Sequence, residues 1–74
     1  MALPIVSGRK VIKALTKAGF KVAGRKGSHI KLKKKVDDKV FVVIVPNHAE
    51  LARGTLKSIL RQANIMKEDF LKLL

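Results

Sequence analysis

One short stretch of this chain could carry out chemistry: Gly27-Ser28-His29 and the residues that follow it. From His29 on, polar and apolar residues alternate, and successive side chains of a strand point to opposite faces. Ile30 and Leu32 would then face a core, while the other side would carry His29, Lys31 and Lys33. Histidine moves protons near neutral pH because its unperturbed pKa is about 6.5. An imidazole in a row of cations predicts a site for a phosphate-bearing ligand.

RNA is such a ligand, and it supplies its own nucleophile. A base that removes the proton of a ribose 2′-hydroxyl drives attack on the adjacent phosphorus, and nearby cations stabilise the charge that builds on the phosphate oxygens. His29 is the candidate base, with Lys31 or Lys33 as the stabilising cation. The only other imidazole, His48, either delivers a proton to the leaving oxygen or contacts phosphate or a partner. Alternatively, His29 serves as both base and acid.

The charge of the chain favours a polyanion as partner. Seventeen Lys and Arg against five Asp and Glu give a formal charge of +12 on 74 residues. Self-repulsion on this scale destabilises a compact state unless a polyanion offsets it, so nucleic acid is the leading partner class. An acidic protein partner, or simply a well-solvated surface, fits the same charge. A further phosphate anchor is expected near Lys57, where a predicted helix begins and presents free N–H groups.

Several classes of protein are excluded by composition. Without cysteine the chain has neither disulfides nor thiolate metal sites. Two histidines without a matching carboxylate spacing do not predict a metal site, and we expect no cofactor. The longest apolar stretch, Val40 to Pro46, is far shorter than the roughly 20 residues that span a bilayer. Residues 1–7 lack the features of a secretory signal. We therefore expect one cytoplasmic domain over residues 1–74, with no membrane partner.

The first half of the chain predicts a helix and two strands. Ser7 is a good N-cap, and helical spacing of apolar residues continues until Gly19, a C-terminal cap. Residues 20–23 alternate and predict a short strand before Gly24, followed by a basic turn over residues 25–27. The strand from His29 comes next, and residues 34–39 are expected to form a hairpin turn.

The second half predicts one strand and two helices. The β-branched run Val40 to Val45 indicates a central strand or one covered on both faces, which Pro46 ends. Thr55 is expected to cap a helix that Asn64 stops. Residues 66–74 predict a short last helix that packs Phe70, Leu71 and Leu74.

These elements predict an α+β fold of order α-β-β-β-α with a short extra C-terminal helix. A three-stranded antiparallel sheet with helices on one face would bury its apolar positions there and leave the opposite face open. If the alternation holds, the open face carries Lys21, His29, Lys31 and Lys33. The first helix also has a cationic side, formed by Arg9, Lys10, Lys13 and Lys17.

The chain resembles HicA-type (YcfA-like) mRNA interferase toxins. The resemblance rests on four ordered motifs: Ala18-Gly19-Phe20, Gly27-Ser28-His29, Val45-Pro46-Asn47-His48, and the stretch Gly54 to Ala63. It implies a double-stranded-RNA-binding-like fold, metal-independent cleavage of mRNA, and a HicB-type antitoxin that covers the active site. It also implies that His29 is catalytic and that Gly27 and Ser28 shape the turn. The candidate RNA- and phosphate-binding residues are Lys21, Ser28, Lys31, Lys33, His48 and Lys57.

Two residues depart from the family pattern. Asn64 stands where such proteins usually have glycine, and asparagine is an adequate substitute in a left-handed cap. Ile30 follows the histidine where a polar or aromatic residue is common, and it fits the inward face of the predicted strand. Two alternatives to an enzyme remain: a non-catalytic RNA-binding module with the same fold, and a domain that binds acidic proteins.

Overall fold

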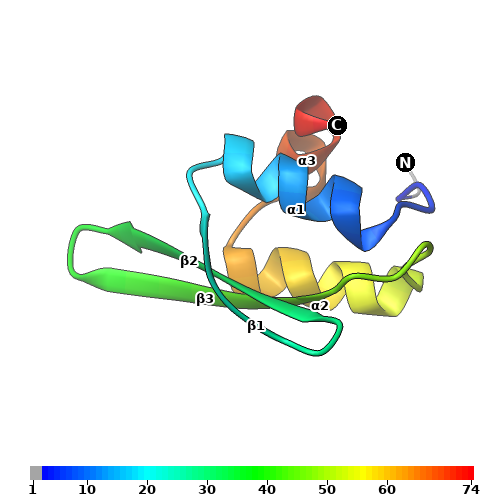
Figure 1. Cartoon of the computed structure of the whole chain (residues 1–74). Coiled ribbons are helices and arrows are strands. Elements are labelled where there is room, and N and C mark those ends of the chain that lie inside the picture. Colours follow the sequence, from blue (N-terminus) through cyan, green and yellow to red (C-terminus); the bar gives the residue numbers. More distant parts are fainter. Residues whose placement is uncertain (1–2) are drawn as a thin grey trace.

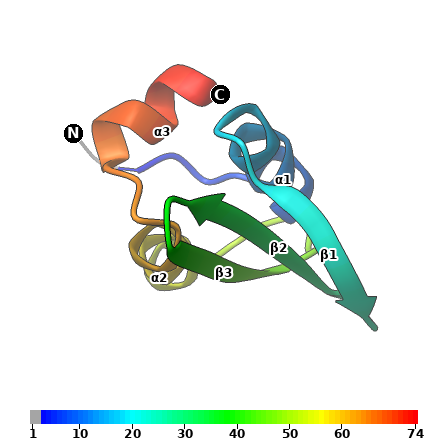
Figure 2. The ribbon, with the colours of Figure 1, turned by 90° about the vertical axis from the view of Figure 1, so that its left-hand side faces the viewer.

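The computed structural model describes residues 3–74 and has helices on one face of a small sheet (Figures 1 and 2). The three strands form one antiparallel sheet in the order β1-β2-β3. This arrangement confirms the predicted α+β fold with its extra C-terminal helix. The elements are α1 (Gly8–Lys17), β1 (Lys21–Lys26), β2 (His29–Val36), β3 (Lys39–Pro46), α2 (Arg53–Ala63) and α3 (Lys67–Leu73).

Helix α1 begins and ends as its sequence predicts. The Ser7 side chain accepts a hydrogen bond from the Lys10 backbone N–H at 3.1 Å, which satisfies one of the free donors of the first turn. The helix ends at Lys17, and Gly19 follows with a φ of +103°, a conformation in which a side chain would be strained. Between these two ends of α1, Val11 and Leu15 are fully buried against the sheet layer.

The start of α1 rests directly on the end of β3. A Cβ atom at Gly8 would overlap the Pro46 carbonyl oxygen and lie 2.9 Å from Asn47 Cα, so only glycine fits. The Gly8 N–H donates to the His48 carbonyl at 2.8 Å across the same contact. The first helix is therefore fixed against the segment that leaves the sheet.

The core lies between the helices and the inner face of the sheet. Ile30 and Leu32 of β2 are buried while their neighbours His29, Lys31 and Lys33 are exposed, which confirms the predicted alternation. Phe20 and Phe70 are also buried, which confirms the prediction for Phe70. The other fully buried large side chains are Val11, Leu15, Val43, Val45, Leu56 and Ile59.

Both hairpins have longer strands and shorter turns than predicted. Strand β1 passes through Gly24 with a bulge after Val22 and continues to Lys26, so the turn is Gly27–Ser28 rather than residues 25–27. The second turn is Asp37–Asp38 alone, and Asp37 has a φ of 54°. Both ladders extend into basic residues whose side chains are exposed, so water and salt screen the repulsion between like charges that face each other across the strands.

The prediction for β3 was wrong. Strand β2 is central, β3 is an edge strand, and only the inner side of β3 is covered. Val40, Val42 and Ile44 are 55%, 40% and 41% exposed. β-branched residues fit a strand on either face, so their abundance indicates a strand without showing which sides are buried.

The C-terminal helices differ in detail from the prediction. Helix α2 starts at Arg53 after Ala52, which has no side-chain cap, so Thr55 lies inside the first turn instead of capping it. Asn64 ends α2 with a φ of 56°, as predicted. Phe70 is buried, but Leu74 is 48% exposed and does not pack as expected. No helix within residues 3–74 is long and apolar enough to cross a membrane.

Candidate functional site

The turn between β1 and β2 determines where His29 lies. Lys26 and His29 pair across the turn Gly27–Ser28, and Gly27 has a φ of +59° that favours glycine. On the other side, His29 pairs with Pro46 at the end of β3. The Ser28 carbonyl accepts the Asn47 N–H at 2.7 Å, which ties the turn to the segment leaving β3. His29 is thus held at the first position of the central strand, with its side chain exposed.

His29 lines a shallow depression of about 580 Å³ on the outer face of the sheet. Lys26 and Lys31 line it as well, so an imidazole and two ammonium groups share one open surface. Gly24 lies opposite Lys31, and a Cβ atom there would have no heavy atom within 4 Å. The absence of a side chain at this position keeps the depression open beside the lysine. Its remaining lining residues are Ala23, Arg25 and Ile44.

The predicted residues Lys21 and Lys33 continue the cationic surface away from His29. They pair directly across β1 and β2 and line a neighbouring depression of about 530 Å³. Lys31 and Lys33 are two residues apart on β2, so both project from the same face as His29. A line of positive charge thus runs along the sheet from the histidine. Lysines that recur at every second residue of a strand suit a ligand with repeated phosphates.

The predicted residues Ser28, His48 and Lys57 lie outside this depression. Ser28 is exposed in the turn, and its backbone rather than its hydroxyl makes the bond to Asn47. His48 is exposed on the loop after β3, and its carbonyl accepts the Gly8 N–H. Lys57 is exposed on α2, in the helix layer. His29 and Lys31 therefore line the same depression, and His48 does not line it.

Sequence reasoning missed Lys26 and Arg25 as lining residues, because the basic turn was expected to include them. Instead they belong to β1, and Lys26 lies directly opposite His29. A two-residue turn at Gly27–Ser28 would have predicted this pairing, since it places the residues on either side of it opposite each other. Gly27 was the residue that indicated such a turn, because glycine readily takes the positive φ that two-residue hairpin turns need.

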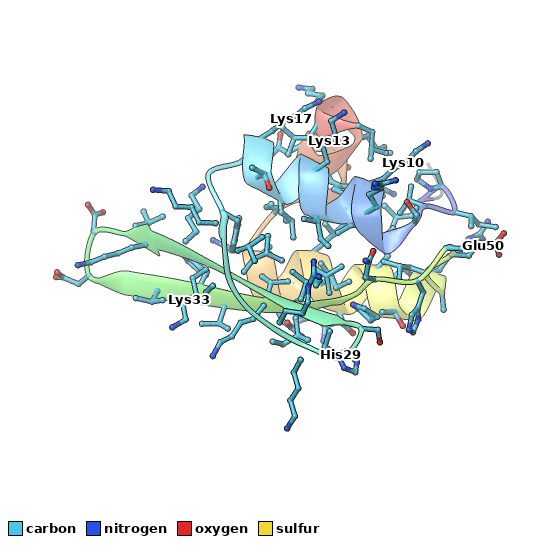
Figure 3. The ribbon with its side chains drawn as sticks, viewed as in Figure 1. Lys10, Lys13, Lys17, His29, Lys33 and Glu50 are labelled. Carbon is cyan, nitrogen blue, oxygen red and sulfur yellow. The ribbon has the colours of Figure 1, made fainter. Side chains whose placement is uncertain are left out.

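Acidic residues are remote from this surface. Asp37 and Asp38 form the far hairpin turn, Glu50 lies in the loop before α2, and Glu68 and Asp69 begin α3. Figure 3 shows Glu50 at the edge of the molecule, apart from His29 and Lys33. Among residues 3–74, no three His, Cys, Asp or Glu side chains come together as a metal-binding group. The outer face of the sheet is therefore cationic and apolar only.

A second group of lysines lies on the other side of the molecule. Figure 3 shows Lys10, Lys13 and Lys17 projecting from the side of α1 that is turned away from His29. They line a groove of about 340 Å³ together with the segment before α1 and the end of α3. The Lys17 ammonium donates to the Leu73 carbonyl at 3.3 Å. This groove contains no histidine.

Comparison with known proteins identifies the family. A family model described as the HicA toxin of bacterial toxin-antitoxin matches residues 8–65. The match runs from the first residue of α1 through the whole sheet to just beyond α2, and it includes His29. A comparison with curated proteins finds no match. Because the family model covers well over half of the chain, this chain belongs to the HicA toxin family of bacterial toxin–antitoxin systems.

Proposed function

We propose that this toxin is a metal-independent endoribonuclease that cleaves mRNA and uses His29 as its general base. The observation that carries the proposal is the depression in which His29 lies with Lys26 and Lys31. Proton transfer requires the imidazole to reach the ribose hydroxyl, and an exposed side chain at the start of β2 is accessible to an RNA strand lying on the sheet. The family resemblance independently gives His29 this role.

The reaction uses groups of the RNA and of this face alone. His29 accepts the proton of a ribose 2′-hydroxyl, and the oxygen attacks the adjacent phosphorus as the bond to the 5′-oxygen of the next nucleotide breaks. The products are a 2′,3′-cyclic phosphate end and a 5′-hydroxyl end. The protonated imidazole or water returns the proton to the leaving oxygen. Lys26 and Lys31 stabilise the negative charge on the phosphate oxygens.

RNA is bound mainly through its backbone. Lys31 and Lys33, with Lys21 across the sheet, offer ammonium groups to successive phosphates. Bases would gain little from stacking, because Phe20 and Phe70 are buried and Phe41 is partly buried against the core. Ser28, His48 and Lys57 are proposed as peripheral phosphate contacts. The toxin should therefore cleave with limited sequence preference of its own.

We further propose a HicB-type antitoxin as the partner that neutralises the toxin, and the cytoplasm as the place where it meets mRNA. Membership of a toxin–antitoxin family supports an antitoxin partner. The charge of +12 supports an acidic surface on that partner.

Replacement of His29 by Ala tests the proposal. Loss of a general base should lower the rate of RNA cleavage about 100- to 10,000-fold, while RNA affinity changes less than about threefold. Single-turnover cleavage of a labelled RNA and an equilibrium binding assay measure the two quantities. His48→Ala is the comparison variant: it removes the other imidazole, which lies outside the depression and is proposed only as a peripheral phosphate contact, so it should lower the cleavage rate far less than His29→Ala.

Full cleavage by the His29→Ala protein would refute the proposed mechanism. If the unsubstituted protein binds RNA but produces no cleavage at any concentration, the protein is an RNA-binding module without catalysis. Circular dichroism of each variant confirms that the fold is retained.

A further inference from the structure

Two arginines from different elements line one depression on the helix side of the sheet. Arg9 comes from the first turn of α1, Arg25 comes from β1, and Asn47 after β3 lines the same depression of about 270 Å³. We call these three residues the arginine pocket. No acidic residue lines it. Its floor is aliphatic and is made by Ile12, Val22 and Ile30.

The pairing of β1 with β2 shows on which side of the sheet Arg25 lies. Arg25 lies opposite Ile30, which is 3% exposed and faces the core, and residues directly opposite each other in an antiparallel pair project to the same face. The next pair, Lys26 and His29, projects to the outer face. Strand β1 is an edge strand, and Figure 2 shows it on the same side of the molecule as α1. The arginine pocket and the depression with His29 therefore lie on opposite faces of one free edge.

The polar side chains of the arginine pocket have no partner among residues 3–74. Neither arginine makes an ion pair or a side-chain hydrogen bond there, and Asn47 bonds only through its backbone N–H, to Ser28. A guanidinium group carries only donors, in a planar fork that matches the oxygens of a phosphate, and the Asn47 amide adds two more. Several donors without an acceptor predict an anion with several oxygens.

A nucleotide phosphate fits the arginine pocket better than a free ion does. The aliphatic floor offers nothing to a hydrated ion, whereas the ribose of a nucleotide can lie against Ile12 and Val22. A carboxylate would suit the same donors, but Arg25 also lines the depression that contains His29. This shared residue favours a ligand that reaches both places. An RNA strand with one phosphate at His29 needs only to pass around the edge of β1 to reach the pocket.

We propose that the arginine pocket binds a flanking backbone phosphate of the RNA, and that the RNA bends around the edge of β1 and contacts both faces of the sheet. The proposal rests on the function proposed above, because it places the scissile phosphate at His29. Arg9, Arg25 and Asn47 are binding residues and take no part in proton transfer. Because they hold the substrate and the transition state equally, they should lower KM without changing kcat.

The test is the double variant Arg9→Gln/Arg25→Gln. Both side chains are exposed, so the fold should be retained. The matched control is Arg53→Gln/Arg61→Gln, which removes the same charge from two exposed arginines of α2 that line neither depression. Three substrates are compared: a single-stranded RNA oligonucleotide, the same oligonucleotide with one flanking phosphate replaced by a neutral methylphosphonate, and a dinucleoside monophosphate, which has only the scissile phosphate.

We expect kcat/KM of Arg9→Gln/Arg25→Gln on the oligonucleotide to fall about 10- to 100-fold, mainly through KM, and to stay within about twofold on the dinucleotide. The methylphosphonate, moved along the strand, should weaken the parent protein by a similar factor at one position and add little to the loss in the double variant. The salt dependence of oligonucleotide binding should fall by about 0.7 in log–log slope for one lost phosphate contact. The control pair should lose less than about threefold.

An equal loss on the dinucleotide would place the arginines at the scissile phosphate and overturn the proposal. An equal loss in the control pair would assign the effect to net charge and overturn it as well. Arg9→Lys/Arg25→Lys keeps the charge without the fork, and full recovery by it would contradict a site built on guanidinium geometry. If no version cleaves RNA, the proposed function fails, while equilibrium binding of the oligonucleotide with and without the methylphosphonate still decides the pocket.

Discussion

Two surfaces of this protein carry lysines, and they differ in what accompanies the charge. On α1, Lys10, Lys13 and Lys17 are spaced by three and four residues and therefore share one side of the helix. On the outer face of the sheet, lysines at every second residue of β2 follow directly from His29. Figure 3 shows that the two surfaces face opposite sides of the molecule. One short ligand cannot lie flat on both.

The difference teaches that positive charge alone favours a polyanion but does not indicate where a reaction could occur. The lysines of α1 line an apolar groove, and the Lys17 ammonium bonds to a carbonyl of α3. Their long stems cover apolar surface while their ammonium groups stay near water. On the sheet, Lys31 of β2 and Lys26 of β1 line an open depression together with the His29 imidazole. Only the second arrangement provides both a cation and a base for one phosphate.

The largest expected effect comes from the place where the helix layer meets the sheet. Gly8→Ala puts a Cβ atom into the Pro46 carbonyl oxygen, and we expect it to lower the free energy of unfolding by about 3 kcal/mol. Chemical denaturation followed by circular dichroism measures the change. Gly54→Ala is the control, because a Cβ there meets nothing within 4 Å and alanine favours the helix. Equal stabilities of the two variants would show that the contact at Gly8 relaxes without cost.

Removal of two charges from each surface compares them directly. Lys31→Gln/Lys33→Gln should lower RNA cleavage about 10- to 30-fold and reduce the salt dependence of RNA binding by about 1.4 in log–log slope. Lys10→Gln/Lys13→Gln removes the same net charge from α1 and should change cleavage less than about twofold. Cleavage and binding assays over a range of salt concentrations measure both effects. Similar losses from the two pairs would mean that RNA contacts both sides, or that net charge alone controls binding.

The turn before His29 gives a smaller effect. Gly27→Ala places a side chain at a φ of +59°, which costs about 1 to 2 kcal/mol of stability. Thermal or chemical unfolding measures this cost. Gly24→Ala has open space and no positive φ, so it should not lose stability. It would, however, place a methyl group beside the depression. A neutral result for Gly27→Ala would indicate that the turn changes its conformation, and a cleavage assay would then show whether His29 moves with it.

The smallest expected effect lies on α1. Ser7→Ala removes the hydroxyl that accepts the Lys10 N–H, and loss of such a cap costs about 1 kcal/mol. Denaturation measures the loss, and cleavage by the folded fraction should be unchanged. Ser7→Asp retains an acceptor and serves as the control. Reduced cleavage by fully folded Ser7→Ala protein would link the α1 surface to the reaction and weaken the distinction between the two surfaces.

Features with local causes could be predicted from the sequence. The cap at Ser7, the stop at Gly19 and the alternation from His29 to Lys33 depend on neighbouring residues, and the structure has all three. The open face with its histidine followed from that alternation together with the placement of helices on one side. The catalytic role proposed for His29 rests mainly on the family resemblance.

Features that depend on pairing between strands could not be predicted. The position of β3 at the edge follows from which strands find one another, and its β-branched sequence suits a central strand equally well. Lys26 joins the site only because the turn has two residues, and one more residue would have moved the pairing. His48 was a candidate by residue type, yet the contact that involves it uses its backbone carbonyl.

The two backbone hydrogen bonds at Asn47 and His48 join three segments that are distant in the chain. The Asn47 N–H holds the turn before His29, and the His48 carbonyl holds the first residue of α1. Local unfolding at this junction would therefore release the start of α1 and the turn before His29 together, so the helix layer and the candidate site depend for their stability on the same two hydrogen bonds.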